Sequence, residues 1–322
     1  MIPRRYRRYA RDELKGNFGS MRHLLVAFTA LLSCPLGDFR TPKHARMGDN
    51  CYHVFLDVGS NRGVHGRFYF EPEKYPGSKF AKRFTELIPD TATRRKTSCV
   101  FAFEPNPVHV AAQEKTMSMY RAMGWRYYFL NVAAGDERGN LTFWLNNEFY
   151  GSDERNQEFA KLQVGFATEN RDPENPNNQH IDVPTIDLSH WIRHQVLMRK
   201  IPDANDGEFY DSSSPPLVIM KMDIEGSEYR AFSKMVLDRV ACQLDHIYGE
   251  VHAFRNRYNS FPLRNGVVLD NTRATQFFWA LNTILRMENC KTTWVEFDDE
   301  QYHTDGQPYP TAASPIDPHH SR

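Results

Sequence analysis

The sequence predicts an α/β protein whose mostly parallel sheet is covered by helices on both faces. Short apolar runs without polar alternation, such as Val54–Val58, Val100–Phe103 and Leu217–Met222, are typical of parallel strands that are buried on both sides. Helix-length segments follow these runs, so strands and helices alternate along the chain, as in a sheet with crossover helices. A chain of 322 residues is long enough for one large domain or two small ones.

The first strand, Val54–Val58, runs into a turn with the spacing D-x-G-x-N-x-G from Asp57 to Gly63. Gly59 and Gly63 allow a sharp turn and a close approach to a ligand, and a helix is expected to follow. The spacing is not the dinucleotide motif G-x-G-x-x-G. An acidic residue at this edge suits a ligand with a cationic or hydroxyl-rich part, such as S-adenosylmethionine. The alternative is an ordinary strand–turn–helix in which Asn61 is a cap.

The next elements follow the same alternation. We expect a helix start and then an insertion over Phe68–Lys96, which is rich in proline and aromatic residues. The second strand, Val100–Phe103, ends at Glu104–Pro107, and a helix is predicted over Val108–Met123 because proline is tolerated in a first turn. A third strand is predicted at Tyr127–Leu130.

The middle of the chain is more polar. Leu141–Leu145 is predicted as a strand, and Asn146–His180 as a long loop that covers or borders the site. Val183–Leu188 leads into a helix through Trp191, with Asp187 as its N-cap. Pro202–Pro216 is predicted to be an acidic loop.

The last part of the chain repeats the alternation of strand and helix. The expected elements are strand Leu217–Met222, helix Tyr229–Leu237, strand Leu244–Val251, helix Ala274–Met287 and strand Thr292–Phe297.

Composition excludes some classes of protein. Lys plus Arg equals Asp plus Glu at 40 each, so no overall field favours nucleic acid as a partner. The five cysteines form no C-x-x-C pair, which excludes a zinc ribbon, and their low, odd number argues against a disulfide framework. Cys99 and Cys242 are expected to be small core residues.

The chain is predicted to have three parts: residues 1–50, the main domain at 51–300, and a disordered tail at 301–322. The first part is basic and then apolar, but Leu24–Leu32 is far shorter than the roughly 20 residues of a membrane-spanning helix. It resembles the core of a signal peptide, and an amphipathic helix packed on the domain is the alternative. A signal over residues 21–35 would give a secretory or membrane-associated protein, and otherwise the protein would be cytoplasmic. The sequon Asn140–Thr142 is compatible with the secretory route.

An acidic residue, Glu104, ends the second predicted strand. A carboxylate at this place can accept hydrogen bonds from the two hydroxyls of a ribose, or it can serve as a helix N-terminal carboxylate. Its combination with Asp57 and Gly59 is more specific than any of the three alone.

Six motifs, each weak alone, occur in one order within residues 52–255. They are Asp57–Gly63, Phe103–Pro107, Asn131–Asp136, Val183–Asp187, Lys221–Glu228 and Glu250–His252. With this ordered set the chain resembles the FkbM-type S-adenosylmethionine-dependent methyltransferases. It departs from them in the two long insertions, Phe68–Lys96 and Asn146–His180, and in Arg62, where the family usually has an apolar residue.

The resemblance implies a Rossmann-like class I fold and a set of cofactor-binding residues. Asp57 and Gly59 would lie beside the methionine part of S-adenosylmethionine, Glu104 would hold the ribose, and the loop from Asn131 to Asp136 would border the adenine. Asp136 either bonds the adenine amino group or is a turn residue. The full implied set is Asp57, Gly59, Asn61, Glu104, Asn106, Asn131 and Asp136.

The resemblance also implies O-methylation of a hydroxyl, on a glycan or a small metabolite. A hydroxyl needs a base, and the candidates are Asp223, Glu225 and His252, the last with an ordinary pKa of ~6.5. Lys221 either lowers the pKa of the acceptor or pairs with a carboxylate. The alternative for the set is an ion-paired network at the sheet edge.

Other readings of these residues remain. Asp223, Glu225, Glu250 and His252 could ligate Mg²⁺ or Mn²⁺, but the spacing matches no dedicated metal motif, so the prediction is catalysis without a metal. A binding or scaffold protein without turnover is the alternative function. A nicotinamide-dependent oxidoreductase is disfavoured by the absence of G-x-G-x-x-G.

Overall fold

A six-stranded sheet in the order β12–β9–β8–β1–β2–β3 forms the centre of the fold, and every neighbouring pair in it is parallel. Its strands are β1 (His53–Val58), β2 (Ser98–Phe103), β3 (Arg126–Leu130), β8 (Val218–Met222), β9 (His246–Gly249) and β12 (Trp294–Glu296). The computed structural model describes residues 45–146, 166–168, 180–202, 215–252, 261–262, 268–269, 271–297, 299 and 306–310. The predicted parallel sheet is confirmed, with strand limits that differ by a few residues.

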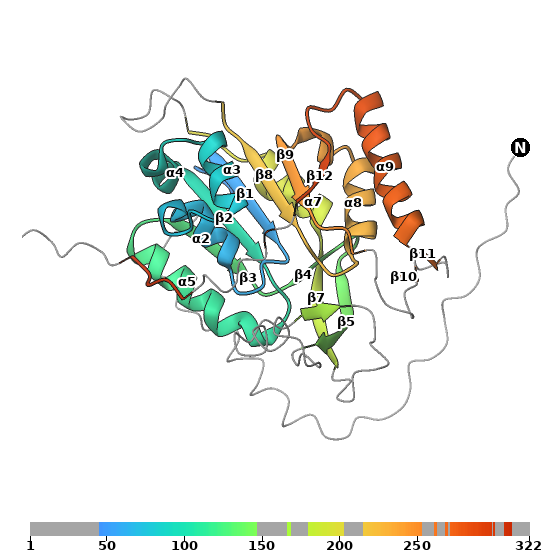
Figure 1. Cartoon of the computed structure of the whole chain (residues 1–322), viewed down its shortest axis with the longest axis horizontal. Helices are drawn as coiled ribbons and strands as arrows, with labels where there is room; N and C mark the ends of the chain where they lie inside the picture. The colour runs from blue at the N-terminus through green and yellow to red at the C-terminus, as the bar shows by residue number, and fades with distance from the viewer. Residues whose placement is uncertain are drawn as a thin grey trace, which may run out of the picture. The chain divides into compact units, whose positions relative to one another are not determined.

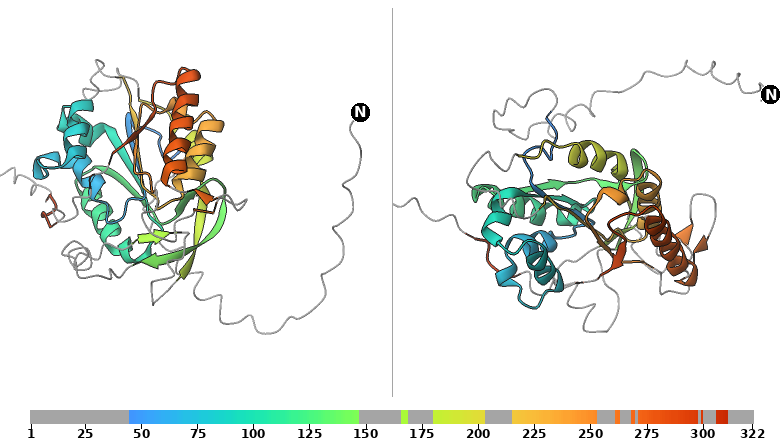
Figure 2. Two further views of the ribbon diagram at one scale, coloured as in Figure 1. Left: turned by 45° about the vertical axis from the view of Figure 1, so that its right-hand side comes forward. Right: turned by 90° about the horizontal axis from the view of Figure 1, so that it is seen from above.

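Helices cover both faces of this sheet (Figures 1 and 2). One face carries α2 (Val64–Phe70), α3 (Lys79–Leu87), α4 (Thr91–Thr97) and α5 (Val110–Ala122). The other carries α7 (Leu188–Trp191), which continues as a π-helix over Ile192–Leu197, with α8 (Glu228–Leu237) and α9 (Asn271–Met287). Asp187 caps α7 as predicted, because its side chain accepts a hydrogen bond from the His190 N–H.

Alternation along β1 divides the core into two clusters. Phe55 packs among residues of α2 and α3, whereas Val54 and Leu56 pack toward α7, α8 and α9. A central strand that is covered on both faces carries apolar residues at both parities, which explains the unbroken apolar run in the sequence.

A second sheet, in the order β4–β7–β5–β6, was not foreseen. Its strands are β4 (Ala133–Gly135), β5 (Gly139–Asn146), β6 (Phe166–Thr168) and β7 (His180–Asp187). The strand predicted at Leu141–Leu145 is real, but it pairs antiparallel with β7 and stands outside the parallel sheet. A short hairpin joins β10 (Phe261–Pro262) and β11 (Val268–Leu269). Most of the two predicted long loops, including residues 147–165 and 203–214, lies outside the described residues.

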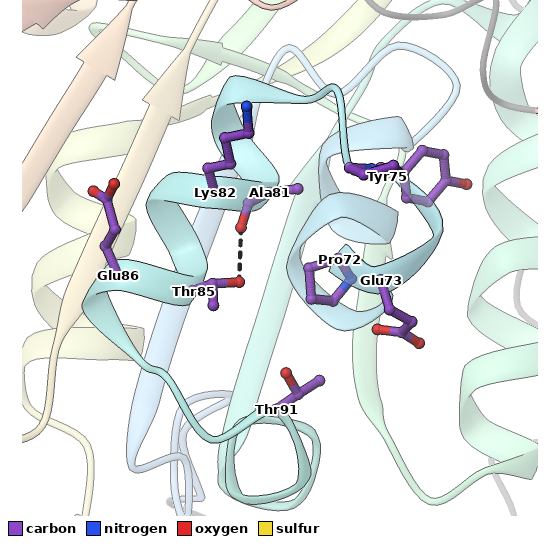
Figure 3. Close-up of a pocket in the computed structure, with 9 residues that line it drawn as sticks. Pro72, Glu73, Tyr75, Ala81, Lys82, Thr85, Glu86 and Thr91 are labelled. Carbon is purple, nitrogen blue, oxygen red and sulfur yellow. Dashed lines mark hydrogen bonds between the residues drawn. The ribbon is translucent and has the colours of Figure 1, made fainter.

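The insertion predicted at Phe68–Lys96 contributes to the core. It forms a 3₁₀ helix at Pro72–Lys74 and helices α3 and α4, and aromatic residues such as Phe80 and Phe84 are fully buried there. An open pocket of about 540 Å³ lies on this insertion (Figure 3). None of the predicted site residues lines it.

Two disulfides correct the expectation from the cysteine count. Cys51 pairs with Cys99 and Cys242 with Cys290, with Cα–Cα distances of 5.5 and 4.7 Å. The odd number misled because Cys34 is the fifth cysteine, and because each partner lies 48 residues away in sequence. Disulfides of this kind persist in oxidising compartments.

The Cys51–Cys99 bridge joins the start of β1 to the start of β2, and its removal should destabilise the sheet. For the double variant Cys51→Ser/Cys99→Ser we expect the free energy of unfolding in urea to fall by about 2–4 kcal/mol. Without the bridge, the unfolded chain is no longer closed into a loop and gains conformational entropy. Cys34→Ser is the matched control and should leave the midpoint unchanged. Equal midpoints for the double variant and the wild type would contradict this expectation.

Part of the segment after residue 300 is described and contacts the helices. The Arg67 guanidinium donates to the carbonyls of Gln307 and Pro308, and the hydroxyls of Tyr309 and Thr116 lie 2.7 Å apart. The limits of the three predicted parts stay predictions, and most of the predicted disordered tail lies outside the described residues.

Among the residues that the structure describes, no helix has both the length and the apolar character needed to cross a bilayer. The apolar segment predicted to resemble a signal lies outside them.

Candidate active site

The register of the parallel sheet gathers the predicted acidic residues at one edge. Asp57 pairs with Lys221 in β8, which in turn pairs with Tyr248 in β9. Because side chains alternate with period two, these three face the α2–α3 side. Backbone hydrogen bonds continue past the strand ends: the Asp223 N–H donates to the Val58 carbonyl, and the Glu250 N–H donates to the Met222 carbonyl. In each of the three neighbouring strands an acidic residue follows two positions after the residue in register with Asp57. These acidic residues, Glu104, Asp223 and Glu250, therefore lie at the same edge of the sheet.

Two turns meet at this edge, and Gly59 makes their contact possible. Its φ is +80°, and a Cβ at this position would lie 1.7 Å from the carbonyl oxygen of Asp223. Gly63 also has a positive φ, of +84°. The sequence predicted a close approach at Gly59 to a ligand, and the structure shows a close approach to the neighbouring turn.

Glu104 joins the turn after β1 to the turn after β2. Its two carboxylate oxygens accept hydrogen bonds from the N–H groups of Asn61 and Asn106, both at 2.8 Å. The Asn131 side-chain amide donates to the Glu104 carbonyl at 2.8 Å. Burial raises the pKa of Glu104 to about 7, although these N–H groups oppose the rise. The structure thus brings together Asn61, Glu104, Asn106 and Asn131, all predicted to bind the cofactor.

Asp57 is the least satisfied group of the site. Its side chain is fully buried, and neither oxygen accepts a hydrogen bond from any described residue. Burial raises its pKa to about 7, even though the Lys221 charge acts in the opposite direction. The nearest ring nitrogen is Nδ1 of His65, 3.9 Å from Oδ1, and it too lacks a hydrogen bond. A buried carboxylate without donors is costly, so this position is suited to a ligand that brings them.

Two buried residues that the motifs did not indicate, Gln113 and Tyr127, support the glycine turn. The Gln113 amide donates to Ser60 Oγ at 2.8 Å and to the Asn61 carbonyl at 2.7 Å, and it accepts from the Tyr127 hydroxyl at 2.6 Å. Gln113 lies in the middle of a predicted helix and Tyr127 in a predicted strand. Only their burial, not any spacing in the sequence, reveals this role.

Lys221 holds the turn after β1 against Asp223. Its ammonium group donates to the Gly59 carbonyl at 2.8 Å and to Asp223 Oδ2 at 2.9 Å. Burial opposes its charge, but Asp223 and Asp57 together keep the pKa of Lys221 above its ordinary value. Of its two predicted roles, pairing with a carboxylate is therefore present in the structure.

His252 follows β9 and lies among carboxylates. Its Nε2 is 3.5 Å from Asp223 Oδ1 and 3.6 Å from Glu225 Oε2, and its Nδ1 is 3.2 Å from Glu228 Oε1. Burial opposes the charged form, yet Glu225 and Glu228 raise the pKa of His252 well above its ordinary value. The neutral imidazole, which an ordinary pKa would give, is thus disfavoured at neutral pH.

The pKa values of the two carboxyls beside His252 are shifted in opposite directions. Burial raises the pKa of Glu225 to about 8, and neighbouring carboxylates add to the rise. Burial acts in the same direction on Asp223, but Lys221 and His252 outweigh it and hold its pKa below the usual value. Asp223, Glu225 and His252 therefore form one electrostatically linked cluster, as predicted from their positions after adjacent strands.

Asp136 contacts helix α8. Its carboxylate is 4.0 Å from the Arg230 Nε of α8. Both roles of Asp136, as a turn residue and as a partner of the adenine amino group, stay predictions.

Comparison with known proteins gives one match. The family model described as the methyltransferase FkbM domain matches residues 57–264, from Asp57 through the segment that follows His252. No curated protein and no solved structure matches the chain. The family match covers more than half of the sequence and contains every candidate site residue named above. On this match and this fold, the chain belongs to the FkbM methyltransferase family.

Proposed function

We propose that this methyltransferase uses S-adenosylmethionine to methylate a hydroxyl group. The observation that carries the proposal is Asp57, a fully buried carboxylate without a hydrogen-bond donor at the end of the first strand. Its position beside the glycine turn suits the positively charged methionine part of this cofactor.

The residues around Asp57 fit the rest of the cofactor. Glu104 has lone pairs left after accepting its two backbone N–H groups, and these can accept a pair of ribose hydroxyls. Gly59, Asn61, Asn106 and Asn131 shape the backbone around it. When bound, S-adenosylmethionine supplies an electrophilic methyl group on a sulfonium sulfur.

The chain's own contribution to chemistry is positioning and removal of a proton. Asp223, Glu225 and His252 form the cluster at which an acceptor hydroxyl would lose its proton. Lys221 fixes Asp223 by its 2.9 Å ion pair, so the orientation of this carboxylate is set before the acceptor arrives.

The acceptor is proposed to be a glycan or a small hydroxylated metabolite. Carboxylates at the edge can accept hydrogen bonds from several hydroxyls, and they would repel an anionic acceptor. The two disulfides suit an oxidising secretory compartment, where glycans are built and displayed. The balanced charge of the chain gives no support to nucleic acid as an acceptor.

Calorimetry with S-adenosylmethionine and S-adenosylhomocysteine tests the cofactor. We expect wild-type protein and Glu86→Gln, a change at an exposed carboxylate of α3, to bind equally. Glu104→Gln should bind at least tenfold more weakly, because a neutral amide replaces a charged hydrogen-bond acceptor. A folded wild-type protein that binds neither compound would refute the proposal.

Transfer of a labelled methyl group to a panel of glycans and hydroxylated metabolites tests the reaction. Asp223→Ala should abolish transfer while the cofactor still binds. Label recovered on nitrogen or carbon, and not on oxygen, would reject the hydroxyl acceptor.

A further inference from the structure

We propose that Asp223, Glu225 and His252 bind one divalent metal ion. The inference rests on the proposed function in one respect, since the ion would hold the acceptor hydroxyl. The sequence alone predicted a site without metal, because the ligands come from two separate segments with no motif spacing. The fold brings these segments together.

The separations between His252 and the two carboxylates are ones that a single ion can span. One oxygen of Asp223, one of Glu225 and one ring nitrogen of His252 are all within 4.8 Å of one another. Bonds of about 2.0–2.2 Å to a small divalent ion place its ligand atoms about 3–4.4 Å apart. The distances of 3.5 and 3.6 Å from His252 Nε2 to the two carboxylates fall in this range.

Glu228 orients the imidazole in the way that metal-binding histidines require. This fully buried carboxylate lies 3.2 Å from His252 Nδ1 and accepts a hydrogen bond from the His252 backbone N–H at 3.0 Å. Its other oxygen accepts from the Gly226 N–H at 2.8 Å. A proton on Nδ1 that is held by a carboxylate leaves the Nε2 lone pair free to ligate, and it also fixes the ring.

The spacing around Nε2 is not that of a simple ion pair. A charged N–H that donates to a carboxylate comes to about 2.7–2.9 Å. Instead, three carboxylates surround Nε2 at 3.5, 3.6 and 3.9 Å, the last being Glu250. All three are farther from Nε2 than the oxygen of a charge-assisted hydrogen bond, and the nearer two are at a distance that a shared ion allows.

The oxygen atoms around this space also suit a cation. Four carboxylates, those of Asp223, Glu225, Glu228 and Glu250, are near His252. Lys221 is the nearby ammonium group, and it is bound to Asp223 Oδ2 and the Gly59 carbonyl. Asp223 Oδ1, which faces His252, remains available to an ion.

The ligand set indicates which ion and what it would do. Two carboxylates and one imidazole suit Mn²⁺ or a similar divalent ion better than a soft metal. Three protein ligands leave positions for water or for an acceptor hydroxyl, whose pKa would fall on coordination. The acceptor class is then a hydroxyl compound with a second oxygen placed to chelate.

Mn²⁺ titration followed by electron paramagnetic resonance tests the site directly. Protein freed of metal with EDTA, and without cofactor, should remove one equivalent of Mn²⁺ from the signal of the free ion. Glu225→Gln and His252→Gln are each expected to weaken binding at least tenfold, and Glu228→Gln about tenfold through the histidine. Glu86→Gln should bind as the wild type does.

Unfolding midpoints and cofactor calorimetry on the same variants show whether each is folded. Wild-type protein that removes no Mn²⁺, or site variants that bind it as tightly as the wild type, would overturn the proposal. A wild-type protein that binds S-adenosylmethionine but not Mn²⁺ would defeat the metal site alone. One that binds Mn²⁺ but not S-adenosylmethionine would uphold the metal site and defeat the proposed cofactor.

Discussion

Replacing Asp57 with asparagine should weaken S-adenosylmethionine binding and, at the same time, stabilise the free protein at pH 8. The two effects have one cause. The Asp57 carboxylate is fully buried and receives no hydrogen bond from a described residue, so its negative charge is unfavourable until a ligand compensates it. Asparagine keeps the shape and removes the charge.

The sign of the pH effect follows from the pKa of Asp57, which is raised from 3.8 to about 7. Between these two pKa values the unfolded carboxyl is ionised while the folded one still holds its proton, so each rise in pH favours the unfolded state. For this group stability is therefore highest below pH 4, falls as the pH rises from about 4 to 7, and levels off above 7. The change in pKa corresponds to about 4 kcal/mol at pH 8. Asp57→Asn should remove most of this loss, and Glu104, whose pKa is also about 7, should retain its own share.

Affinity for the cofactor should move the other way. A hydrogen bond to a charged group contributes about 1.5–3 kcal/mol, so its loss corresponds to a decrease of roughly 10- to 150-fold. Urea unfolding at pH 5 and pH 8, with calorimetry at pH 8, measures both quantities. Asp182→Asn, at an exposed aspartate of β7, should change neither. Unchanged affinity in Asp57→Asn, or an equal loss of stability at both pH values, would show that Asp57 has another role.

Much of the parallel sheet follows from local sequence. Runs such as Val54–Val58 are apolar at every position, and only a strand covered on both faces requires that. Motif residues at the ends of such runs must meet at one edge, because parallel strands end on the same side. The sequence alone therefore predicts that Asp57, Glu104 and Asp223 lie close to one another.

What could not be predicted depends on contacts between distant segments. The apolar pattern of β5 fits either sheet, and only its antiparallel pairing with β7 places it outside the parallel one. The two disulfides each join residues 48 positions apart. Glu228 belongs to a sequence motif, but its contact with the His252 ring exists only because the turn after β8 packs against the end of β9. Spacing along the sequence does not predict contacts between such distant segments.

A comparison of Gly59→Ala with Gly124→Ala should separate backbone strain from close packing at the site. Both glycines have left-handed φ values, +80° and +75°. At either position an alanine is strained in this conformation, which lowers the free energy of unfolding by about 1–2 kcal/mol. A Cβ at Gly124, between α5 and β3, meets nothing within 4 Å, so Gly124→Ala should lose only that amount.

Gly59→Ala adds a clash with backbone. Its Cβ would lie 1.7 Å from the carbonyl oxygen of Asp223 and 2.7 Å from the carbonyl carbon. The turn after β8 must then move away, which breaks the hydrogen bond from Lys221 to the Gly59 carbonyl or shifts Asp223. We expect an additional loss of about 1–3 kcal/mol in the free energy of unfolding in urea, or failure to fold where Gly124→Ala folds.

Methyl transfer should fall at least 100-fold in Gly59→Ala and stay at the wild-type rate in Gly124→Ala, because displacement of a positioned group by about an ångström is costly to catalysis. Equal unfolding energies for the two variants would mean that the two turns can separate freely, and that the cluster around Asp223 does not depend on the turn after β1.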